Sequence, residues 1–111
     1  MIHLLTAKAT PEQMAEMLVE LGDCIKVAVD IRREILVGGG EKHVDCEQVL
    51  LDHGSAQENL WGATWWAGVN FITHESMINL RPQQRNFSMM IQDQAIRERV
   101  TEIIRHLLEN V

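Results

Sequence analysis

The sequence predicts a single α+β domain, built from a mainly antiparallel sheet of about five strands with three helices packed on one face. Two observations carry this prediction. The 111 residues, of which 46% are hydrophobic, match the size and composition of one globular domain. The predicted elements follow the order strand, helix, strand, strand, helix, strand, strand, helix, in which hairpins replace regular βαβ alternation. A doubly wound parallel sheet is the alternative.

The first helix is predicted to follow a short apolar strand at residues 2–5. Thr10 can cap this helix, Pro11 suits its first position, and Gln13 can return a hydrogen bond to the cap. Apolar residues then recur at helical spacing, and Gly22 is typical of a helix end. These apolar positions are Met14, Met17, Leu18 and Leu21.

Two strands are predicted next, at residues 24–31 and 34–37. In the first strand, apolar side chains alternate with Lys26, Ala28 and Asp30, which is the pattern of a half-buried strand. The second strand follows so closely that the pair should form a tight antiparallel hairpin, although its turn contains neither asparagine nor glycine.

The second helix is predicted to be capped by Asp45 and to end at Gly54. Asp45 and Gln48 have the spacing of a capping box, and Val44 and Val49 have that of a hydrophobic staple. Three glycines at residues 38–40 precede this helix, but they do not match a phosphate-binding glycine motif. A structural helix cap is therefore expected here.

The remaining elements are predicted as a hairpin, a loop and a final helix. Residues 60–67 and 71–80 should form the two strands, and residues 81–90 should form a loop. Asp93 is expected to cap the last helix, whose apolar positions form one wide stripe. These positions are Ile96, Val100, Ile103, Ile104, Leu107, Leu108 and Val111.

Composition argues against several classes of function. The net charge of −6 argues against nucleic acid as the main partner, and no stretch of about 20 apolar residues predicts a membrane span. Cys24 and Cys46 are too few for a disulfide framework and lack the spacing of a structural zinc site. We therefore expect a cytoplasmic protein with reduced thiols and no cofactor.

Three phrases in the chain are specific in combination. They are Gly-Gly-Glu-x-His-x-Asp from Gly39, Glu-Asn-Leu-Trp-Gly from Glu58 and Ile-Asn-x-Arg-Pro-x-Gln from Ile78. Together they resemble a family of short bacterial proteins known as a domain of unknown function, over most of the chain. The sequence departs from the family pattern at Arg85, where glycine is expected. The resemblance implies a single domain and identifies no catalytic residue.

The first candidate site is the loop with Glu41, His43 and Asp45. These residues alternate, so an extended segment would place all three on one side, where they would suit zinc, manganese or iron. Helix capping by Asp45 and solvation account for most of the same residues. We therefore expect no bound metal here.

The second candidate site is the loop that contains Asn79, Arg81, Arg85 and Asn86. Two guanidinium groups and several amides would suit a small anionic ligand, because arginine binds carboxylates and phosphates through paired hydrogen bonds. The alternative is a solvated loop in which Arg81 pairs with a carboxylate of the same chain.

Trp65 and Trp66 are candidates for an interface. As neighbours in a strand they must face opposite sides of the sheet, so one indole should remain outside a core that lies on one face. A twofold homodimer would cover it.

Two classes of function follow. The favoured one is a non-catalytic binding or interaction protein that self-associates. The alternative is a small metal-dependent or acid/base hydrolase that uses Glu41, His43 and Asp45.

Overall fold

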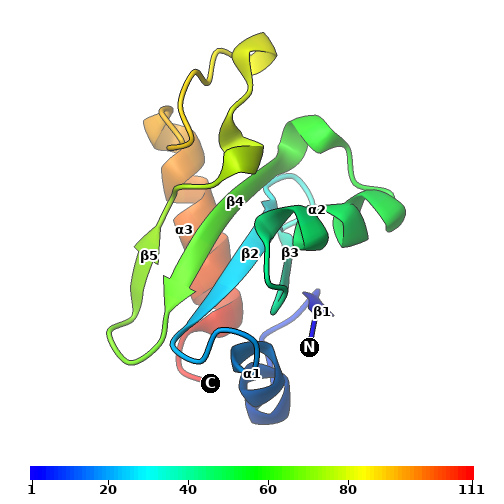
Figure 1. The fold of residues 1–111 in the computed structure, drawn as a ribbon, viewed down its shortest axis with the longest axis vertical. Helices are drawn as coiled ribbons and strands as arrows, with labels where there is room; N and C mark the ends of the chain where they lie inside the picture. Colours follow the sequence, from blue (N-terminus) through cyan, green and yellow to red (C-terminus); the bar gives the residue numbers. More distant parts are fainter.

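The computed structural model describes residues 1–111 as one α+β domain with a five-stranded antiparallel sheet (Figure 1). The strand order is β1-β3-β2-β4-β5. The strands are β1 (His3–Leu5), β2 (Cys24–Asp30), β3 (Ile35–Gly38), β4 (Leu60–Trp66) and β5 (Phe71–Thr73). The helices are α1 (Pro11–Leu18), α2 (His43–Asp52) and α3 (Gln94–Leu108), with single 3-10 turns η1 (Gln57–Asn59), η2 (Met77–Asn79) and η3 (Pro82–Gln84). The predicted fold class is confirmed.

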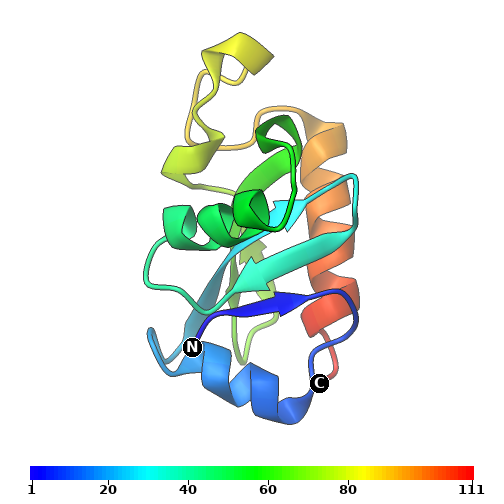
Figure 2. The same ribbon diagram turned by 90° about the vertical axis from the view of Figure 1, so that its right-hand side faces the viewer.

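The helices cover both faces of the sheet, so the prediction that all three pack on one face was wrong. Val27 and Val29 of β2 join the larger core with α1 and α3, whereas Ala28 joins a smaller core with Cys46 and Leu50 of α2. Figure 2 shows α2 and α3 on opposite sides of the sheet. The pattern of β2 was misleading because a small residue such as Ala28 also fits beneath a helix.

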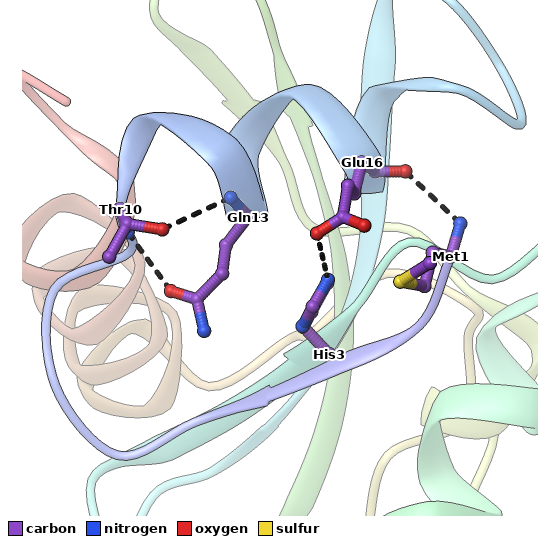
Figure 3. A network of polar contacts seen from close by, with 5 residues as sticks. All are labelled: Met1, His3, Thr10, Gln13 and Glu16. Atoms are coloured by element: carbon purple, nitrogen blue, oxygen red, sulfur yellow. Dashed lines mark hydrogen bonds and ion pairs between the residues drawn. The ribbon is translucent and has the colours of Figure 1, made fainter.

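The start of α1 agrees with the predicted capping box. The Thr10 hydroxyl accepts a hydrogen bond from the Gln13 amide at 3.1 Å, and the Gln13 side chain accepts one from the Thr10 amide at 2.9 Å (Figure 3). The helix is also tied to β1, because His3 Nε2 lies 3.2 Å from Glu16 Oε1. The buried side chain of Met17 attaches α1 to the larger core.

The predicted hairpin of β2 and β3 is confirmed, and its turn works without glycine. Glu34 takes the left-handed conformation with φ of 59°, which a non-glycine residue adopts only at some cost. The buried Asp30 carboxylate offsets this cost, since its Oδ1 accepts hydrogen bonds from the amides of Arg32 and Arg33, each at 3.0 Å. The aspartate therefore organises the turn from its first residue.

Helix α2 begins three residues before the predicted start, so the prediction that Asp45 caps it was wrong. His43 is the first helical residue, Lys42 occupies the cap position without a side-chain hydrogen bond, and Asp45 lies within the first turn. The glycines before it are closely packed. Gly39 has φ of +100°, and a Cβ atom there would lie 2.2 Å from the Met1 carbonyl oxygen. Close packing against the first residues of the chain thus explains the glycine.

Strand β5 ends at Thr73, well short of the predicted end at residue 80. The following chain is held beside β4 by the buried Asn79, whose side chain makes the two hydrogen bonds that a neighbouring strand would make. Asn79 Oδ1 accepts a hydrogen bond from the Gly62 amide at 2.7 Å, and Nδ2 donates one to the Gly62 carbonyl at 2.9 Å. Because one side chain satisfies this part of β4, the backbone can leave the sheet and form η2 and η3.

The helices show no segment suited to crossing a bilayer, since none is both long enough and sufficiently apolar. Cys24 and Cys46 are both buried and free.

Candidate functional site

The largest cleft in the molecule lies on the α2 side of the sheet and has a volume of about 560 Å³. It is bounded by β2, by the start of α2 and by η2. Its lining combines basic, polar and apolar side chains and includes no carboxylate: Lys26, Lys42, His43, Val44, Ser76, Met77 and Ile78.

Two of the three lysines in the chain line this cleft. Lys26 faces it because the residues of β2 alternate between the two sides of the sheet, and Lys42 immediately precedes α2. No side chain caps α2, so the amides of its first turn are not bonded by a cap. The positive end of the helix therefore adds to the charge of the two lysines.

His43 contributes a neutral ring to the cleft. Its Nε2 lies 2.9 Å from the Ala63 carbonyl oxygen, which can only accept, so this nitrogen carries the proton. The Thr64 hydroxyl lies 3.4 Å from the same nitrogen. Burial lowers the pKa of His43 below its ordinary value of 6.5, with Lys26 adding to the effect and the bond to Ala63 opposing it. The imidazole is therefore uncharged at neutral pH.

Three of the seven lining residues are apolar. Val44 is 51% exposed and Met77 is 80% exposed, although both are large hydrophobic residues. Ile78 is half-buried, and the buried Ser76 hydroxyl accepts a hydrogen bond from the Ile78 amide at 3.3 Å. A ligand with both an anionic and an apolar part would match both kinds of residue in this lining.

The first sequence-predicted site is only partly at the cleft. His43 lines it, but Glu41 and Asp45 do not. The extended alternation that would align the three residues is absent, because α2 begins at His43 and residues two apart do not share a helix face. Nowhere does the structure group three or more histidine, cysteine, aspartate or glutamate residues as a metal site would require.

The second predicted site is a buried structural network over much of its extent. Arg81 is 3% exposed and donates to the carbonyl oxygens of Ile78 at 3.0 Å, Gln57 at 2.7 Å and Leu60. Its guanidinium also lies 4.4 Å from the centre of the Trp61 ring. Burial lowers the pKa of Arg81, and the nearby Glu47 opposes that change.

The other residues of that site divide between the interior and the surface. Asn79 and Asn86 are buried, and both bond to backbone groups of their own chain. Arg85 is exposed and takes the left-handed conformation with φ of 60°. Only Arg85 of the four has a side chain open to solvent, so anion binding by the set stays a prediction.

The two neighbouring tryptophans face opposite sides of the sheet, as their positions predict. Trp65 is buried in the larger core on the α3 side, and its Nε1 donates to Asn70 at 3.1 Å. Trp66 is partly exposed on the α2 side, beside its cross-strand partner Phe71, which is 58% exposed. Trp66 is therefore the indole available to a partner.

Sequence reasoning identified His43 but missed the other residues of the cleft. Lys26 carried a usable signal, because its place in the alternation of β2 put it on the face opposite Val27. Met77 and Ile78 carried none, since they were assigned to a strand that the structure ends at Thr73. Their position depends on Asn79 and on contacts distant in the sequence.

A comparison with protein families matches residues 3–107 to a family described as a protein of unknown function (DUF5674). The match agrees with the resemblance based on the three sequence phrases. Neither the curated proteins nor the solved structures include a significant match.

Proposed function

The chain belongs to the DUF5674 family, and we propose that it is a non-catalytic binding protein whose cleft takes a small anion with an apolar group. One observation carries this proposal: two of the three lysines line a cleft that contains no carboxylate, in a chain with sixteen acidic residues. Such a concentration of positive charge favours an anionic ligand.

The chemistry of the lining narrows the ligand further. Lysines are compact charges without the paired donors of arginine, so they favour an anion without imposing a planar geometry on it. Val44, Met77 and Ile78 would contact an alkyl or aryl group and remove its surface from water. A medium-chain or aromatic carboxylate has both parts.

Calorimetric titration of the protein with hexanoate, benzoate and hexyl phosphate tests the proposal. We expect at least one of them to bind, and Lys26→Met and Lys42→Met each to weaken that binding tenfold or more. Lys8→Met is the matched control, because Lys8 is exposed and lies outside the cleft. Absence of binding for all three compounds, or equal losses in the three lysine variants, would contradict the proposal.

The hydrolase alternative has less support from the geometry. The hydrolase was predicted to use Glu41 and Asp45 together with His43, but both carboxylates lie outside the cleft lining. A binding protein that catalyses no reaction does not need proton transfer by Glu41, His43 or Asp45.

We also propose that the protein self-associates as a homodimer in the bacterial cytoplasm. The exposed apolar side chains support self-association, since large surface groups of this kind are typical of interfaces. The free buried thiols suit a reducing compartment such as the cytoplasm. The resemblance to short bacterial proteins supports a bacterial origin.

A further inference from the structure

Residues 76–92, here called the arm, concentrate apolar side chains on the surface. The chain has twelve exposed large hydrophobic residues, and five of them lie in this segment. The part of the arm around η3 projects beyond the sheet at the end of the molecule opposite α1, whereas η2 lies beside β4 (Figures 1 and 2). The five residues are Met77, Leu80, Phe87, Met89 and Met90, with exposed fractions between 42% and 80%.

The arm is built as an ordered element. The backbones of Arg81 and Asn86 pair through two hydrogen bonds of 2.8 and 3.0 Å, and the buried Asn86 side chain donates to the Met90 carbonyl at 2.9 Å. At the base, Glu75 and Met90 form an antiparallel bridge. Because these bonds hold the backbone of the arm in place, binding of a partner would cost little additional backbone ordering entropy.

The charges of the arm differ from those of the rest of the chain. The arm contains two arginines and no acidic residue, so the remainder of the chain carries a net charge of −8. Of these two arginines, Arg81 is buried and Arg85 presents its charge at the surface. At the opposite end of the molecule, residues 9–25 contain α1, four acidic residues and no lysine or arginine. Val19, at the end of α1, is 75% exposed. The arm and this segment are therefore complementary in charge and share apolar groups.

We propose that the arm docks on residues 9–25 of a second copy of the chain, and that two such contacts close a twofold dimer. This inference rests on the proposed self-association and specifies its interface. The arm and α1 lie at opposite ends of the longest dimension of 38 Å, so two antiparallel copies would place each arm beside the partner's α1. Contact between the two arms is disfavoured, because it would bring the Arg85 side chains together.

Light scattering coupled to gel filtration, over a range of protein concentrations, tests this interface. We expect a dimer whose dissociation constant rises tenfold or more in Phe87→Ser and in Arg85→Asp, and also rises with salt concentration. Combining Arg85→Asp with Glu20→Arg should restore most of the affinity, since the charges are then exchanged. Phe71→Ser and Arg32→Asp are matched controls on other exposed surfaces and should leave the dimer unchanged.

The outcomes separate this inference from the proposals on which it builds. A wild-type protein that remains monomeric at every concentration would contradict both self-association and the arm interface. A dimer that tolerates the arm variants but dissociates in Trp66→Ser would keep self-association and overturn the arm interface. Species that grow beyond a dimer would overturn the twofold arrangement, because they indicate an open head-to-tail contact.

Discussion

Arg81 contacts three elements, η1, β4 and η2, through a single guanidinium group. It contacts the carbonyls of Gln57, Leu60 and Ile78, and it covers the ring of Trp61. A planar group with several fixed donors can satisfy these acceptors together, whereas the single ammonium of lysine cannot. The residue that most resembles an anion-binding arginine in the sequence therefore acts as a structural support.

We predict that Arg81→Lys lowers the free energy of unfolding by about 2 kcal/mol, because buried carbonyl groups lose their charged donors. Urea denaturation at neutral pH measures this change. Arg85→Lys is the control, since Arg85 is exposed, and it should change the free energy by less than about 0.5 kcal/mol. Equal effects of the two substitutions would show that the buried contacts of Arg81 contribute nothing specific.

At the scale of elements, the three helices begin in different ways. Thr10 and Asp93 cap α1 and α3 through side-chain hydrogen bonds of 3.1 and 3.0 Å, whereas Lys42 gives α2 no such bond. At the start of α2, closely packed glycines precede the helix and His43 bonds to the Ala63 carbonyl. This absence of a cap leaves the positive helix end beside the cleft.

The effect of replacing Asp45 follows from its place in the first turn of α2. Asp45→Ala should lower the free energy of unfolding by less than about 0.5 kcal/mol, because only a favourable interaction with the helix dipole is lost. Asp93→Ala should cost about 1 kcal/mol, because it removes a cap. Thermal unfolding of the two variants compares them directly. A larger loss for Asp45 than for Asp93 would restore Asp45 as the cap in solution.

At the scale of the whole molecule, the sheet is covered by two cores of unequal size. The larger core holds 17 buried residues beneath α1 and α3, and the smaller holds six beneath α2. The cleft lies on the side of the smaller core, where α2 and η2 leave part of the sheet uncovered. Most of the buried apolar surface therefore lies on the α1 and α3 side of the sheet, and the α2 side keeps a cleft that can accept a ligand.

The stability of the whole molecule should fall as the solution becomes mildly acidic. Burial lowers the pKa of both His43 and His74 below 6.5, so the unfolded chain takes up protons before the folded chain does. The contribution of the two histidines to the free energy of unfolding is therefore complete above about pH 6.5. It decreases as the pH falls from there toward the lowered pKa values of the folded chain. Denaturation between about pH 7.5 and 5.5, without ligand, measures this loss.

Substitution of the two half-buried histidines separates their contribution from that of other groups. The His43→Gln and His74→Gln variants should each lose less stability than the wild type over the same pH range. His106→Gln serves as the control, because His106 is exposed. If neither His43→Gln nor His74→Gln alters the pH profile, the two histidines are not responsible for the acid sensitivity.

The sequence by itself determined the local structure wherever neighbouring residues carry the stabilising interactions. The cap of α1, the hairpin of β2 and β3, the apolar stripe of α3 and the α+β class all depend on spacing within a few residues. Only the tertiary structure decided that α2 covers the second face, that β5 is short and that Arg81 is buried. These features depend on long-range contacts such as Asn79 with Gly62, whose energies no local pattern reports. The cleft belongs to this second group, because β2, α2 and η2 meet only in the folded chain.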